Sequence, residues 1–167
     1  MTSATTSPVL DPTRQMLRHV VATLAYRAGK TVRGAPDDFA SFQASPNTRT
    51  PAQILAHMGD LADWALSIVS GKQQWHNSDP LPWPQEVNRF FKSLEALDAY
   101  LASDQPLHGD PHKLFQGGLA DALTHTGQLA MLRRMAGVPI KGENYFAAEI
   151  TVGRVGDDQA PPRKPFD

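Results

Sequence analysis

An acidic residue and a histidine stand four positions apart in the apolar stretch from Gly117 to Leu132 of this 167-residue chain. Asp121 is the only formally charged residue of that stretch, and His125 follows it. If the stretch is a helix, positions i and i+4 project from one face, so the carboxylate and the imidazole converge on one point. A buried carboxylate costs several kcal/mol unless it is neutralised. We therefore expect Asp121 to bind a metal, pair with a cation or face solvent.

A third group with ligand chemistry lies on another predicted helix. His57 shares the helical i, i+3, i+4, i+7 spacing of an apolar face with Ile54, Met58 and Leu61. Two imidazoles and one carboxylate make a three-ligand set that leaves coordination positions open for water or substrate. The chain has no cysteine, so any metal must use nitrogen and oxygen ligands. Two simpler interpretations stay open: a carboxylate that orients a structural histidine, and an ion pair with protonated His57.

Several neighbours are candidates for supporting roles at this site. Gln128 continues the same helix face, where it would hydrogen-bond a ligand or a bound water. Glu143 and Tyr145 are candidate catalytic residues, because the segment that carries them could fold over the open coordination positions. Gly127 costs about 1 kcal/mol relative to alanine inside a helix, which predicts a close helix contact beside the site.

The other histidines and nearby acids are expected to have ordinary roles. We interpret four histidines as solvent-facing or capping residues: His19, His76, His108 and His112. Asp60 and Asp63 follow His57 on the second predicted helix and are expected to be solvated. The three tryptophans are expected to anchor the core or the loops.

Bulk composition excludes several classes of partner. Lys and Arg number 16 against 17 Asp and Glu, so no overall positive field attracts nucleic acid or an anionic membrane. The first residues lack the pattern of a signal peptide, and no apolar run approaches the roughly 18 to 20 residues of a membrane span. We expect a cytoplasmic protein with a small-molecule substrate.

Cap and stop signals predict an all-α protein, a four-helix bundle with a short irregular C-terminal extension. The helices are expected over residues 12–28, 51–70, 84–101 and 117–134. Gly29 is predicted to end the first helix. Residues 140–156 fit either a short strand or one or two helical turns. We assign residues 1–156 to one domain and residues 157–167 to a loosely held, proline-rich tail.

Three stretches together resemble the DinB/YfiT-like superfamily of bacterial metalloenzymes, over most of the chain. They are Thr50-Pro-Ala-Gln-Ile-Leu-Ala-His57, His125-Thr-Gly-Gln128 and Leu132-Arg-Arg-Met-Ala-Gly137. The resemblance implies a four-helix bundle with a long crossover, frequently a homodimer, that holds a divalent metal through three side chains. In many relatives the late helix supplies two histidines and the second helix one. Here these positions are Asp121, His125 and His57, so Asp121 departs from the family pattern.

The resemblance also implies a class of reaction. Characterised relatives include transferases and isomerases that use low-molecular-weight thiols such as bacillithiol or mycothiol. We therefore expect a divalent-metal-dependent enzyme, a thiol-dependent transferase or a hydrolase, with zinc, nickel, manganese or iron as its ion. The alternatives are a metal-binding module without turnover, such as a carrier or a stress sensor, and a metal-free helical dimer.

Overall fold

Four long helices form the predicted bundle in the computed structural model, which describes residues 11–166. They are α1 (Pro12–Val32), α2 (Pro51–Val69), α3 (Trp83–Ala102) and α5 (Ala120–Met135). The short helix α4 (Pro111–Leu114) and the π-helical turn η2 (Phe115–Leu119) lead directly into α5. Among the described residues, no helix has the length and apolar character needed to cross a membrane.

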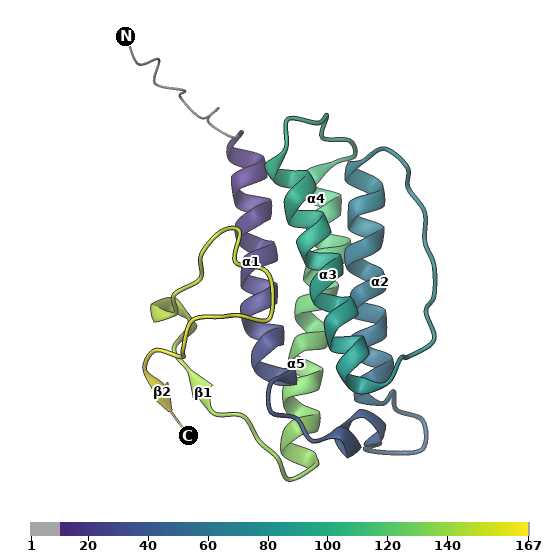
Figure 1. Cartoon of the computed structure of the whole chain (residues 1–167), viewed down its shortest axis with the longest axis vertical. Helices are drawn as coiled ribbons and strands as arrows, with labels where there is room; N and C mark the ends of the chain where they lie inside the picture. Colours follow the sequence, from purple (N-terminus) through teal and green to yellow (C-terminus); the bar gives the residue numbers. More distant parts are fainter. Residues whose placement is uncertain (1–10, 167) are drawn as a thin grey trace.

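The chain makes one long crossover along the bundle, between α2 and α3 (Figure 1). Helices α2 and α3 run in the same direction, and the connection between them, residues 70–82, follows the whole length of α2. Helix α2 packs against α3 and α5, and α1 packs against the same two helices. The interface of α2 with α5 therefore joins the two segments that carry the predicted ligands.

A capping residue followed by proline starts α1, α2 and α4. The Asp11 side chain accepts a hydrogen bond from the Arg14 backbone, and Thr50 forms a capping box with Gln53. Asp110 caps α4 in the same way. The last helix was predicted to start at Gly117, which was wrong. The continuous helical stretch of α4, η2 and α5 starts earlier, at Pro111, because an aspartate followed by proline gives the same start signal there.

The glycines of the last helix explain the π-helical turn. Gly118 lies so close to α2 that an added Cβ would stand 3.3 Å from the carbonyl oxygen of Leu61. Gly117 faces the ring of Trp64. These two glycines permit the close approach of α2 and η2, whereas the contact predicted at Gly127 is absent, because nothing in the described structure lies within 4 Å of a Cβ there.

Helix α1 is one turn longer than predicted. Gly29 is a helical residue packed against Phe91, where an added Cβ would meet the ring at 3.4 Å. The glycine with a positive φ of 65° is Gly34, beyond the C-cap Arg33. Gly29 is thus a packing residue and not the end of the helix.

The C-terminal segment lies beside α1 and away from α2 (Figure 1), and at Gly156 it comes close to Glu95 of α3. Strand β1 (Gly142–Glu143) pairs antiparallel with β2 (Pro165–Phe166), and η3 (Tyr145–Ala147) is a single 3₁₀ turn. Within residues 140–156 the strand covers only Gly142–Glu143, and the alternating residues 146–152, which fitted a strand or helical turns, hold no strand and only part of the turn η3. The predicted tail is held in place, since β2 pairs with β1 and Ala160 is buried.

Candidate metal centre

Helices α2 and α5 bring His57, Asp121 and His125 together. One ligand atom from each side chain lies within 4.8 Å of the other two. The Nε2 atom of His57 is 3.4 Å from Asp121 Oδ2, and the Nε2 atom of His125 is 3.5 Å from Asp121 Oδ1. The two imidazole rings stand at 89° to each other, with centroids 4.8 Å apart. The carboxylate thus presents one oxygen to each imidazole.

These distances are long for hydrogen bonds, although His57 Nε2 and Asp121 Oδ2 form one at 3.4 Å, and they also suit two ligands of one metal ion. Charge-assisted hydrogen bonds between nitrogen and oxygen measure about 2.7–2.9 Å. Two ligand atoms bound tetrahedrally at zinc distances of about 2.0–2.1 Å are separated by about 3.4 Å. The two nitrogen-to-oxygen distances, 3.4 and 3.5 Å, match that edge. The spacing leaves room for an ion between the groups.

The cluster is more buried at its histidines than at its carboxylate. The side chains of His57 and His125 are 21% and 12% exposed, whereas that of Asp121 is 46% exposed. The carboxylate thus contacts both histidines and also faces solvent. Among the described residues, Asp121 forms ion pairs with these two histidines and with no lysine or arginine.

The surroundings of the two histidines suit metal ligation. Burial lowers the pKa of His57, and the nearby His125 lowers it further, against the opposing effect of Asp121. Nδ1 of His125 lies 2.8 Å from Oε1 of Gln128. Because an amide oxygen can only accept, Nδ1 donates this hydrogen bond, and Nε2 is the ring nitrogen that faces Asp121. Gln128 thereby holds the His125 ring in one orientation, as residues that hydrogen-bond metal-binding histidines do.

A tryptophan from the crossover connection covers His57. The Trp75 ring lies edge-on to the His57 ring with centroids 5.7 Å apart, and it also contacts Trp64 at 5.9 Å. Trp75 was predicted to anchor the core or the loops. The sequence does not indicate that it faces His57, because this contact depends on the path of residues 70–82.

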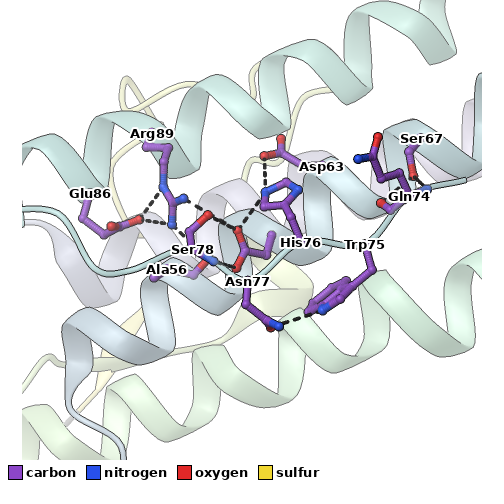
Figure 2. Close-up of polar contacts among 11 residues, drawn as sticks. Ala56, Asp63, Ser67, Gln74, Trp75, His76, Asn77, Ser78, Glu86 and Arg89 are labelled. Carbon is purple, nitrogen blue, oxygen red and sulfur yellow. Dashed lines mark hydrogen bonds and ion pairs between the residues drawn. The ribbon is translucent and has the colours of Figure 1, made fainter. Parts of the chain in front are cut away.

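A second group of potential ligands lies one turn further along α2 (Figure 2). Nε2 of His76 is 3.0 Å from Asp60 Oδ1 and 3.5 Å from Asp63 Oδ2. Asp60 is only 2% exposed, so its predicted solvation was wrong, whereas the side chain of His76 is 46% exposed, as predicted, and also contacts Asp60. The reason is the crossover connection, which passes over this face of α2 and buries it.

The second group already has its partners. The carboxylate of Asp60 accepts hydrogen bonds from the backbone N–H of Ser78 at 2.8 Å and from its hydroxyl at 2.6 Å. The guanidinium of Arg89 lies 3.6 Å from the same carboxylate. A fixed cation at that distance repels a metal ion, and the oxygen lone pairs are in use. We call Asp60, Asp63, His76, Ser78 and Arg89 the clasp, because they fasten the crossover connection to α2.

Helix α3 also holds the crossover connection in place. Arg89 donates from Nε to the buried Glu86 at 2.8 Å and from Nη2 to the carbonyl oxygen of Ala56 at 3.1 Å (Figure 2). Glu86 also accepts from the backbone N–H of Leu81 at 2.8 Å. The crossover connection is therefore held near its middle by α2 and at its end by α3.

The two candidate catalytic residues lie elsewhere. Glu143 is buried and accepts hydrogen bonds from Tyr26 and Lys30 of α1, both at 3.0 Å. Tyr145 packs against Tyr26 and beneath the guanidinium of Arg27. The structure does not bring Glu143 or Tyr145 to the ligand cluster. They attach the C-terminal segment to α1, because the chain turns to that side of the bundle after α5.

Three cavities open beside the ligand cluster, and one of them, of about 370 Å³, reaches Asp121. A cavity of about 470 Å³, which we call the apolar cavity, reaches His125. Its other lining residues are Thr48, Arg49, Ile54, Gln128, Met131 and Leu132. A smaller cavity of about 240 Å³, the polar cavity, reaches His57, and Arg49 lines it as well. A substrate can therefore approach the cluster from the side of either histidine.

No protein-family model, no curated protein and no solved structure matches this chain. The likeness to the DinB/YfiT-like superfamily therefore rests on the three sequence stretches given above.

Proposed function

We propose that this protein is a divalent-metal-dependent enzyme, a thiol-dependent transferase or a hydrolase, whose ion is held by His57, Asp121 and His125. The observation that carries the proposal is the spacing of the three side chains, whose facing nitrogen and oxygen atoms lie 3.4 and 3.5 Å apart. Two imidazoles and a carboxylate suit zinc, iron, nickel or manganese. Three protein ligands leave a coordination position for the reacting molecule.

The surrounding residues support this role. Gln128 fixes the orientation of His125 through a 2.8 Å contact, and Trp75 shields one side of His57 from water. Asp121 offsets part of the positive charge of the ion. When bound, a divalent ion lowers the pKa of a coordinated water or thiol and so supplies a nucleophile near neutral pH. The adjacent cavities supply space for a small-molecule substrate.

Elemental mass spectrometry of the untagged protein tests the proposal. We expect near-stoichiometric metal in the wild type and its loss in His57→Ala, Asp121→Ala and His125→Ala. His76→Ala is the matched control, because it removes a histidine from the clasp and should leave the metal content unchanged. Circular dichroism of each variant checks that the helices are intact.

A wild-type protein that stays empty after dialysis against Zn²⁺, Mn²⁺, Ni²⁺ and anaerobic Fe²⁺ would refute the proposal. That outcome would favour the second candidate, a metal-free helical module. The 46% exposure of the Asp121 side chain is compatible with this candidate, because a solvated carboxylate needs no ion. Melting with and without chelator gives an independent reading. A ligand that binds only the folded state raises its stability, so chelation should lower the melting temperature only if metal is bound.

A third outcome separates binding from catalysis. Metal-loaded protein that stays inert toward panels of thiols, electrophiles and hydrolysable esters would support a metal-binding carrier or sensor in place of an enzyme.

A further inference from the structure

The cation Arg49 stands beside the ligand cluster without a carboxylate partner. Arg49 is exposed, and within residues 11–166 it forms no ion pair. It lines two of the three cavities that reach the cluster, the one at His125 and the one at His57. Its charge also acts on His57, whose pKa it helps to lower. Arg49 is thus an available cation at the entrance to the site.

Besides Arg49, the apolar cavity is lined by the hydrocarbon side chains of Ile54, Met131 and Leu132 and by the polar Thr48, His125 and Gln128. Ile54 and Leu132 are 3% and 7% exposed and form its floor, while Met131 is 58% exposed. Arg49 is the only residue with a fixed charge among those that line this cavity. The volume, about 470 Å³, falls within the roughly 300–1,000 Å³ of small-molecule sites. One cation at the edge of an apolar surface is the pattern that recognises an amphipathic anion.

We propose that the apolar cavity binds an amphipathic monocarboxylate, whose carboxylate pairs with Arg49 and whose hydrocarbon part lies against Ile54, Met131 and Leu132. The bound molecule would then extend toward His125 and the ligand cluster. This inference rests on the proposed function for the identity of the cavity as a substrate site. The carboxylate site itself depends only on Arg49 and the apolar wall.

One guanidinium beside the cavity favours a ligand with one carboxylate. Asp121 and Arg49 cancel in the metal-free protein, and a bound divalent ion would add positive charge beside the cavity. A single guanidinium forms one bidentate pair with a carboxylate, whereas a phosphate dianion would bring a second charge close to Asp121. Loading the protein with metal should therefore strengthen carboxylate binding.

Titration with hexanoate, monitored by calorimetry and by the Met131 methyl resonance, tests the inference on the full chain in zinc-loaded and metal-free forms. Arg49→Gln should weaken hexanoate binding about tenfold or more, the usual effect of removing a charge-assisted hydrogen-bonding partner. Arg49→Lys should weaken it less, because the charge remains. Arg134→Gln is the matched control, since Arg134 is an exposed arginine of α5 that lines neither cavity.

Hexanamide is the probe that separates charge from hydrocarbon contact. We expect it to bind at least tenfold more weakly than hexanoate to the wild type, with no further loss in Arg49→Gln. Equal binding of the two probes, an unchanged hexanoate affinity in Arg49→Gln, or no hexanoate binding in the millimolar range would overturn the inference. The metal content of the same samples tests the proposed function separately. Arg49-dependent binding to a protein that takes up no metal would retain the carboxylate site and refute the metalloenzyme.

Discussion

Replacing Asp60 by asparagine should destabilise the protein far more than the same change at Asp63. Asp60 is buried and accepts two hydrogen bonds from Ser78, at 2.6 and 2.8 Å, while pairing with His76 at 3.0 Å. An asparagine has nearly the same shape but keeps only one acceptor oxygen and adds two donors. Whichever way the amide turns, its NH₂ group faces a donor of the clasp. Asp63 has a single contact with His76, at 3.5 Å, and its side chain is 35% exposed.

The magnitude follows from the contacts that are lost. A hydrogen bond to a charged group contributes about 1.5–3 kcal/mol, and Asp60→Asn weakens one or two of them, so we expect a loss of about 2–4 kcal/mol. Arg89 keeps its partners Glu86 and Ala56, which limits the penalty. Asp63→Asn should cost less than about 1 kcal/mol, as exposed ion pairs do. For a domain of this size, each kcal/mol lowers the melting temperature by roughly 2–4 °C.

Urea denaturation at neutral pH, followed by circular dichroism, measures both changes. Tryptophan fluorescence of the native proteins adds a local reading, because a loosened crossover connection moves Trp75 away from His57. We expect an altered emission for Asp60→Asn and an unchanged one for Asp63→Asn. If the two variants differ by less than about 1 kcal/mol, the clasp does not hold the crossover connection in the way argued from its contacts.

Three further predictions test other parts of the structure. Gly127→Ala should raise the unfolding free energy by about 0.5–1 kcal/mol, since the new methyl group meets no other element. In the same urea titration Gly118→Ala should lower the unfolding free energy, because its Cβ would stand 3.3 Å from a backbone oxygen of α2. Burial and a hydrogen bond to a carboxylate raise the pKa of Tyr26 to about 12, so an absorbance titration should show one late tyrosine that disappears in Tyr26→Phe. A raised pKa means tighter proton binding in the folded state, so the stability that this hydroxyl contributes is present below about pH 10 and is lost as the pH rises toward 12. The lowered pKa of His57 has the opposite sign: the metal-free protein should lose stability as the pH falls below about 6.5, and His57→Gln should flatten that part of the stability profile.

Local signals predicted the helices and the ligand faces. Thr50 and Asp11, each followed by proline, mark helix starts because their side chains cap backbone N–H groups close in sequence. The spacing of four between Asp121 and His125 placed both on one face of a helix, and the structure sets them side by side. His57 joins them because an apolar face predicted from its neighbours packs against α5. These features depend on periodicity, which a single chain displays directly.

The contacts of the crossover connection could not be predicted in this way. Asp60 belongs to a helix in which nearly every face is buried, because residues 70–82 cover the side that periodicity assigns to solvent. The partners Ser78 and His76 lie 16 or more positions later in a polar stretch without periodicity. Gly127 and Gly118 illustrate the same limit, because a helical glycine indicates close packing only where another element passes it. The sequence alone does not tell which one does.

The two groups of histidine and aspartate show that neighbouring charge, more than ligand type, decides what such a group can do. The clasp and the candidate metal centre each combine imidazole and carboxylate within 4.8 Å. In the clasp, Arg89 and Ser78 use the lone pairs of Asp60, and the guanidinium supplies the positive charge that a metal would bring. At the candidate metal centre no lysine or arginine of the described residues pairs with Asp121, so its charge is not offset as that of Asp60 is. The clasp in turn holds the connection that carries Trp75 against His57, so one polar group positions an aromatic side chain beside the other.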